Sequence, residues 1–186
     1  LAELSAIIAD EMNREALPSA MKQALQTIVD QLAAQELQIG TLDRAIHAHH
    51  RANDMSCRLE TVPGIGVIGA TALASTVTDP RGFKTGRDFA AWIGLVPRQH
   101  STGGKERLGG ISKQGDRYLR RLLVVGATAV MRHTKDKPTP IANWIRKLME
   151  KKPFRLVSVA LANKLARIAW VVLTRQEAYR PYELTA

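Results

Sequence analysis

From residue 21 onwards, apolar side chains recur at alternating steps of four and three residues. This spacing places them along one stripe of a single helix, as in the seam of a coiled coil. The stripe consists of Met21, Leu25, Ile28, Leu32, Ile39, Leu42 and Ile46, with Gln35 and His49 at two further positions of the same register. A lone helix would leave this stripe exposed, so the pattern favours dimerisation through residues 19–58. A hairpin within one chain is the alternative.

The long helix is expected to end before residues 61–66, which read Thr-Val-Pro-Gly-Ile-Gly. Pro63 disfavours helix at the preceding residue, and Gly64 and Gly66 can adopt conformations closed to other residues. A new helix is expected next, with these residues facing inward: Val67, Ile68, Ala70, Leu73 and Ala74. Helix, Pro-Gly-Ile-Gly turn and helix form the pattern of a helix-hairpin-helix element, whose backbone amides can hold a phosphate. The alternative is a turn that only joins two packed helices.

Three later helices are predicted from their apolar spacing and their first residues. One begins after Asp116, a plausible cap, and buries Leu119, Leu122, Leu123, Gly126, Ala127 and Val130. The next begins at Thr139-Pro140, and the last runs from about Pro153 to Gln176. No alternating run is long enough to predict a strand. The chain is therefore predicted to be all-α or mostly α, with a helical coiled-coil segment over residues 1–60 and a compact helical domain over residues 61–186.

Residues 98–110 stand out because they contain almost no apolar side chain. They hold four glycines, several basic residues and a single leucine. Such a segment cannot fill a core, so it is predicted to be an exposed, mobile loop. Loops of this composition often carry function.

The charge of the chain is strongly uneven. The formal net charge is +10, yet residues 1–60 carry five basic and nine acidic side chains, a net charge of −4. The remaining 22 basic and eight acidic side chains give residues 61–186 a net charge of +14. A surface that meets nucleic-acid phosphates has this composition. A basic face that only keeps the protein soluble is the alternative.

Composition also limits the cell compartment and the kinds of site. The single cysteine, Cys57, excludes an intrachain disulfide framework and a thiolate zinc cluster. There is no apolar signal core and no uncharged apolar run of membrane-spanning length, and the chain opens at Leu1 rather than at a methionine. We expect a cytoplasmic protein without a membrane partner, cut from a longer polypeptide.

Four segments together resemble a known family. They are Val62–Gly66, Ala91–Pro97, Ser101–Lys105 and Ile111–Leu123, and their order and spacing are more specific than any one of them. They are similar to the insertion-sequence transposases with a DEDD carboxylate set, the IS110 family, which includes the pilin-gene inverting recombinases. The resemblance is close over about residues 60–135, and the preceding heptads look like the coiled-coil insertion of that family.

The resemblance implies an enzyme built from two parts. An N-terminal RuvC-like domain would bind magnesium through four carboxylates, and the present C-terminal transposase domain would supply a serine that attacks a DNA phosphodiester and forms a phosphoserine intermediate. No cofactor is expected in this chain itself. The expected partners are DNA, in some members a guide RNA encoded by the element, and further copies in a dimer or tetramer. Such an enzyme would be bacterial and would act at the nucleoid.

Carried over to this sequence, the resemblance assigns the nucleophile to Ser101, with Thr102 as the alternative one position along. A serine hydroxyl needs a base or a metal for activation, and His100 is adjacent but badly placed, so activation must come from outside the loop. The residues expected to contact nucleic acid are basic side chains and glycines of the turn and the loop: Gly64, Gly66, Gly103, Gly104, Lys105, Arg107, Lys113, Arg117, Arg120 and Arg121.

Other candidate residues are interpreted as structural. His47, His49 and His50 are expected on a solvated helical face, although the spacing of His47 and His50 would allow a metal. Three tryptophans are expected in the core: Trp92, Trp144 and Trp170. Three carboxylates are expected at turns and caps: Asp79, Asp88 and Asp116.

Three functions therefore remain open on the sequence. The first is a recombinase fragment with a serine nucleophile, which would not cleave DNA alone because it lacks the metal-binding carboxylates. The second is a non-catalytic helix-hairpin-helix module that binds nucleic acid and assembles. The third is an oligomerisation module whose charge only aids solubility, and a steep salt dependence of nucleic-acid binding would exclude it.

Overall fold

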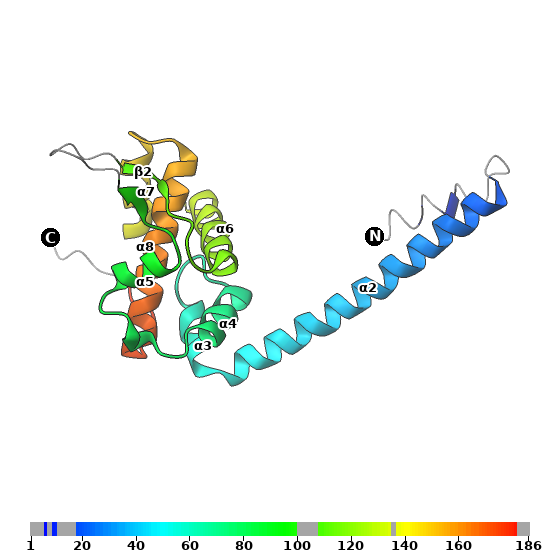
Figure 1. Cartoon of the computed structure of the whole chain (residues 1–186), viewed down its shortest axis with the longest axis horizontal. Helices are drawn as coiled ribbons and strands as arrows, with labels where there is room; N and C mark the ends of the chain where they lie inside the picture. The colour runs from blue at the N-terminus through cyan, green and yellow to red at the C-terminus, as the bar shows by residue number, and fades with distance from the viewer. Residues whose placement is uncertain (1–5, 7–8, 11–17, 100–107, 135–136, 182–186) are drawn as a thin grey trace. The chain divides into compact units, whose positions relative to one another are not determined.

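The computed structural model describes residue 6 and residues 9–10, 18–99, 108–134 and 137–181. The chain divides into two units, Leu1–Ala48 and His49–Ala186. The described part of the first unit is dominated by one long helix, and the second unit is a bundle of shorter helices (Figure 1). The mostly α fold predicted from the sequence is confirmed.

Helix α2, Ser19–Ala52, carries the predicted apolar stripe. Its apolar side chains are poorly covered, and Ile39 and Leu42 are 66% and 64% exposed. The predicted end of this helix is wrong, because α2 stops at Ala52 and a separate helix α3, Asp54–Glu60, follows. The break lies at Asn53, whose backbone is extended and whose side-chain oxygen accepts a hydrogen bond from the Ser56 amide at 2.9 Å. Asparagine is a favoured N-cap, so it starts a new helix here.

The second unit continues from α3 to the C-terminal helix α8. Its elements are α4 (Val67–Thr76), the short 3-10 helix η1 (Pro80–Gly82), α5 (Gly86–Trp92), β1 (Pro97–Gln99), β2 (Leu108–Ile111), α6 (Arg117–His133), α7 (Pro140–Met149) and α8 (Phe154–Arg175). The two strands form an antiparallel ribbon that the sequence did not predict. They are three and four residues long, which is too short for an alternating pattern to stand out.

Helix α8 is the centre of this bundle and contacts α3, α5, α6 and α7 (Figure 1). Its fully buried side chains include Val157, Leu161 and Leu165. By length and composition α8 would also pass for a membrane span, with a mean hydropathy of 1.7. Half of that apolar stretch is buried inside the bundle, as expected for the core helix of a folded domain.

The predicted starts of α6 and α7 are confirmed by their caps. The Asp116 side chain accepts from the Leu119 amide at 2.9 Å, and the Thr139 hydroxyl accepts from the Ala142 amide at 3.2 Å. The prediction for α4 is partly wrong, because Ile68 is 46% exposed rather than buried. The neighbours of α4 cover the face of Ala70 and Leu73, and Ile68 lies outside that face.

Candidate nucleic-acid interface

The central part of the predicted catalytic loop lies outside the described residues. This applies to Ser101 and Thr102 and to the other predicted loop residues, Gly103, Gly104, Lys105 and Arg107. The structure does describe the two strands that the loop connects. Strands β1 and β2 pair with Pro97 opposite Ile111 and Gln99 opposite Leu108. Both ends of the loop are therefore held side by side.

The base of the ribbon is fixed by a close contact between two backbone segments, residues 92–94 and 113–115, which we call the clasp. Gly94 and Gly115 both have positive φ, at +82° and +85°. A Cβ on Gly94 would lie 1.9 Å from the Gln114 carbonyl oxygen, and one on Gly115 would lie 1.7 Å from that of Trp92. Only glycine fits at either position, since both φ and space exclude a side chain.

Arg120 of α6 joins the two segments of the clasp. Its Nη1 donates to the carbonyl oxygen of Ile93 at 2.8 Å and to that of Gln114 at 3.2 Å, so one guanidinium joins both segments. The same atom also reaches the Asp116 carbonyl oxygen at 3.4 Å. The sequence placed Arg120 among the phosphate-binding residues and gave no sign of this structural role. Its contact with phosphate stays a prediction.

Further hydrogen bonds join the two arms of the ribbon and tie the segment before β1 to the bundle. The Ser112 amide donates to the Val96 carbonyl oxygen at 2.8 Å, and the Arg98 guanidinium donates to that of Ser112 at 3.1 Å. From α8, the Asn163 side-chain amide donates to the Leu95 carbonyl oxygen at 3.1 Å. Asn163 was missed in the sequence because it lies among apolar helical positions 68 residues away from its partner. These bonds make the ribbon an extension of the rigid core.

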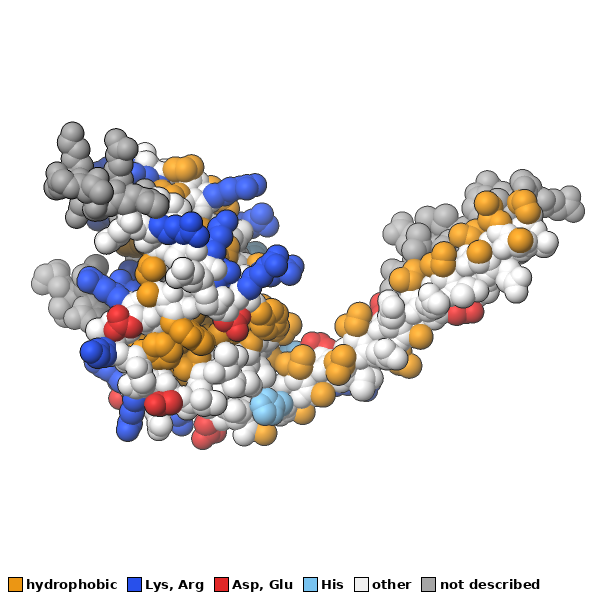
Figure 2. Space-filling view, in the orientation of Figure 1, with side chains coloured by type: hydrophobic (Ala, Val, Ile, Leu, Met, Phe, Trp, Pro, Cys, Tyr) orange, Lys and Arg blue, Asp and Glu red, His pale blue; other side chains and the backbone are white. Residues whose placement is uncertain are grey.

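Arg117 and Arg121 are exposed near the start of α6, one helical turn apart on the same face. Lys113 is also exposed, in the segment that leads into the helix. In the second unit, Lys and Arg side chains gather over α6 (Figure 2). These three predicted residues are thus free to face a ligand, unlike Arg120, and they lie directly after β2.

The two glycines of the predicted hairpin turn differ in their surroundings. Gly64 has φ +84° and packs on α6, where an added Cβ would lie 2.8 Å from the Gly126 carbonyl oxygen. Gly66 is exposed at the N-cap of α4 and has no atom within 4 Å of an added Cβ. The packing against α6 explains the glycine at 64. A role of either residue in binding stays a prediction.

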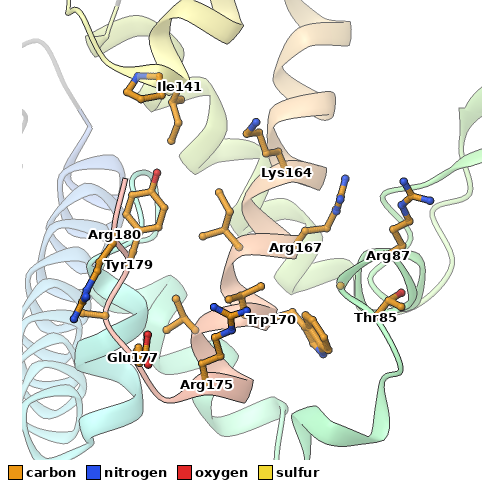
Figure 3. A pocket seen from close by; sticks show the side chains of 16 residues that line it. Thr85, Arg87, Ile141, Lys164, Arg167, Trp170, Arg175, Glu177, Tyr179 and Arg180 are labelled. Carbon is orange, nitrogen blue, oxygen red and sulfur yellow. The ribbon is translucent and has the colours of Figure 1, made fainter. Parts of the chain in front are cut away.

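A groove of about 820 Å³ runs along the outer face of α8 (Figure 3). Its walls are the start of α5 on one side and residues 177–180 on the other. The second wall is anchored by the Tyr179 amide, which donates to the Thr61 hydroxyl at 2.8 Å. Burial raises the pKa of the Tyr179 phenol, so this side chain stays neutral at physiological pH. No motif in the sequence predicted this groove.

His50 is not on a solvated face, contrary to the sequence interpretation. It is 5% exposed, and its ring nitrogens lie 2.7 Å from the Ser56 hydroxyl and 2.9 Å from a Glu60 carboxylate oxygen. The break at Asn53 turns α3 back so that these side chains meet. Within the described residues, no three His, Cys, Asp or Glu side chains gather as a metal site.

The three carboxylates that were interpreted as structural are confirmed in that role. Asp79 accepts from the Arg81 amide at 3.0 Å, Asp88 forms a capping box with Thr85, and Asp116 caps α6. Of the tryptophans, Trp144 and Trp170 pack against the core. Trp92 is 38% exposed and lies at the edge, stacked on Phe89, so the prediction of burial was wrong for it.

Comparison with known proteins places this site in context. Residues 56–141 match the transposase family described as IS116/IS110/IS902. A probable family 20 transposase of Pseudomonas aeruginosa is 50% identical over 89% of this chain and 49% of its own length. The transposase of insertion sequence element IS1111A of Coxiella burnetii is 41% identical over 96% and 48%. The pilin gene-inverting protein of Moraxella bovis is 26% identical over 73% and 39%. The chain thus spans about half the length of these curated relatives, or less.

Proposed function

Because the chain belongs to the IS116/IS110/IS902 transposase family, we propose that it is the DNA-handling C-terminal part of an insertion-sequence transposase and that Ser101 is the nucleophile. One observation carries the proposal. The loop that contains Ser101 joins two paired strands whose base is clamped to α6, and α6 presents Arg117 and Arg121 beside that base. A loop whose two ends are fixed can orient a nucleophile, and nearby exposed cations can stabilise the negative charge of a phosphodiester under attack.

The proposed step is a phosphoryl transfer. The Ser101 hydroxyl oxygen forms a bond to a DNA phosphorus, and the bond from that phosphorus to the oxygen of the departing strand breaks. The proton lost from the serine hydroxyl is balanced by the proton that the departing oxygen gains, so the departing strand leaves as a free hydroxyl. Lys113, Arg117 and Arg121 would hold the flanking phosphates. Lys105, Arg107 and the glycines Gly103 and Gly104 stay predicted phosphate contacts from the sequence.

The magnesium that the family resemblance implies has no site among the described residues of this chain, since no acidic cluster is found there. The family resemblance implies that it would be bound by the N-terminal part of a full-length protein. The present chain binds and orients DNA, and it offers the serine. Its partners would also include further copies joined through α2 and, in the intact element, a guide RNA. The site of action would be the bacterial nucleoid.

The proposal is tested on the full-length parent protein with its DNA and any cognate RNA. A denaturing gel would reveal a covalent protein–DNA adduct in the wild type, in Ser101→Ala and in Thr102→Ala. We expect the adduct in the wild type and in Thr102→Ala and its loss in Ser101→Ala, because only the Ser101 oxygen bonds to phosphorus. Loss in Thr102→Ala alone would move the nucleophile by one residue and overturn the assignment.

A second candidate is a non-catalytic helix-hairpin-helix module for nucleic-acid binding and assembly. The observation that favours it is the turn between α3 and α4, where Gly66 is open to solvent at the start of α4. This function predicts an unchanged adduct, or none, in both serine and threonine variants. The adduct assay therefore separates the two functions.

A further inference from the structure

The groove along α8 combines an apolar floor with a basic rim. Apolar side chains of α8, Ile168, Val171 and Val172 among them, line the floor. All lining residues belong to the second unit and all are described. Tyr179 and Arg180 lie on one side, Thr85 and Arg87 on the other, and α8 passes between them (Figure 3).

The charge around this groove is almost entirely positive. Its lining contains five basic side chains, Arg87, Lys164, Arg167, Arg175 and Arg180, against one carboxylate, that of Glu177. Four of the five are exposed, so their charged groups can turn toward a ligand in solution. The half-buried Lys164 lies over the Trp144 ring, 4.9 Å from its centre. A ligand that matches this lining carries repeated negative charge on its outside and flat apolar groups on its inside.

We propose that this groove binds an unpaired nucleic-acid strand, with its phosphates on the basic rim and its bases against the apolar floor and the rings of Trp170 and Tyr179. Charge complementarity favours this occupant, since the lining carries five basic side chains against one carboxylate and a nucleic-acid strand has a negative charge at every phosphate. A duplex fits less well, because its bases are stacked inside and cannot reach the floor. The inference rests on the proposed DNA-handling function and assigns it a second site.

The position of the groove suits a strand that continues toward the ribbon formed by β1 and β2. The start of α5 forms one wall of the groove, and the end of α5 leads into the clasp at Ile93 and Gly94. Helix α5 has seven residues, which corresponds to about 10 Å. In α8, Asn163 supports the segment before β1, and its neighbour Lys164 lines the groove. Groove and ribbon are thus joined by two rigid elements.

The test measures binding of a labelled oligonucleotide of about 12 nucleotides to this chain by fluorescence anisotropy, over a series of salt concentrations. The probe is used as single-stranded DNA, as RNA and as a duplex of the same sequence. The groove variant is Arg167→Ala with Arg175→Ala. The matched control is Lys147→Ala with Lys151→Ala, two exposed cations of α7 and the following turn that lie outside the groove lining.

We expect tighter binding of the single strands than of the duplex. In the groove variant, the negative slope of log affinity against log salt should become less steep by about 1.4 for the single strands, because two phosphate contacts are lost. The control should keep the wild-type slope. An equal loss in both double variants, or no loss in the groove variant, would overturn the proposal. A preference for RNA or for DNA would show which sugar the groove favours. Either preference supports the site.

Photocross-linking gives an independent measurement of position. An iodinated pyrimidine in the bound strand is expected to attach to the peptides that contain Trp170 or Tyr179. Adducts confined to α6, which contributes no residue to the groove lining, would contradict the groove as the site. Neither experiment depends on Ser101. Failure of the groove would leave the adduct assay unaffected, and loss of the nucleophile assignment would leave strand binding by the groove intact.

Discussion

At the scale of single residues, three arginines of α6 that look alike in the sequence have different surroundings. Arg117 and Arg121 are exposed, whereas Arg120 donates to the backbone of Ile93 and Gln114. The helical register predicts that neighbouring residues face different ways, but it cannot show which carbonyl groups the fold brings beside one of them. The Arg120–Ile93 bond spans 27 residues, so only the folded chain reveals it.

This difference predicts opposite effects of two neighbouring substitutions. Arg120→Ala should lower the free energy of unfolding by about 2 kcal/mol, because charged hydrogen bonds to the clasp are lost. Arg121→Ala should change the free energy of unfolding by less than about 0.5 kcal/mol. It should instead make the slope of log duplex affinity against log salt concentration less steep by about 0.9. Urea denaturation and salt titration measure both quantities. Equal stability of the two variants would show that Arg120 does not hold the clasp.

Residues 64 and 94 show how far sequence reasoning reaches at this scale. Glycine at position 64 was attributed to a turn, and the positive φ confirms a conformation that favours glycine. The contact of Gly64 with Gly126, and that of Gly94 with Gln114, depend on elements far along the chain. Local backbone preference can thus be read from a motif, while close packing between segments cannot.

At the scale of elements, strong caps and long apolar patterns made the later helices predictable. Asp116 and Thr139 start α6 and α7 as expected, and α8 follows its apolar period. The division between α2 and α3 was missed because the apolar stripe already ends at Ile46, so the pattern does not mark where α2 stops at Ala52 or that Asn53 caps a new helix. The ribbon was missed because the pairing of its strands, not their composition, defines it.

The exposed stripe of α2 supports the proposed association between copies. Leu42→Lys should weaken it, because the substitution places a charge at the centre of an apolar helix–helix seam. Analytical ultracentrifugation should show a shift from dimer or tetramer toward monomer. Ala34→Lys is the matched control, since Ala34 is exposed on α2 outside the apolar stripe. If Leu42→Lys leaves the oligomeric state unchanged, α2 does not join the copies.

At the scale of the whole molecule, the charge division follows the structural division. Residues 1–48 carry three basic and seven acidic side chains, and residues 49–186 carry the remaining 24 and ten, which gives −4 and +14. The sequence therefore indicated correctly where the basic charge lies along the chain. It did not indicate the groove, because the start of α5 and the start of α7 meet α8 and residues 177–180 only in the folded chain.

The same scale gives a prediction about activity. This chain alone should bind DNA but give no site-specific strand cleavage when magnesium is added, because the described residues offer no metal-binding cluster to activate a serine. A supercoiled plasmid that carries the element's ends is a sensitive substrate, and full-length protein is the positive control. Reproducible nicking by the pure chain at one site would refute the proposal that cleavage needs a metal site outside this chain.

Helix α8 has a consequence for the synthesis of the protein. On emerging from the ribosome it is a long apolar segment, comparable in hydropathy to a membrane span. Its binding surface on α5 and α6 has by then already been made, because both precede it in the chain. The order of synthesis therefore lets the segment be covered as soon as it appears. A ribosome stalled before Phe154 would leave α5 and α6 without their cover, and chaperones would be needed to keep such nascent chains from aggregating.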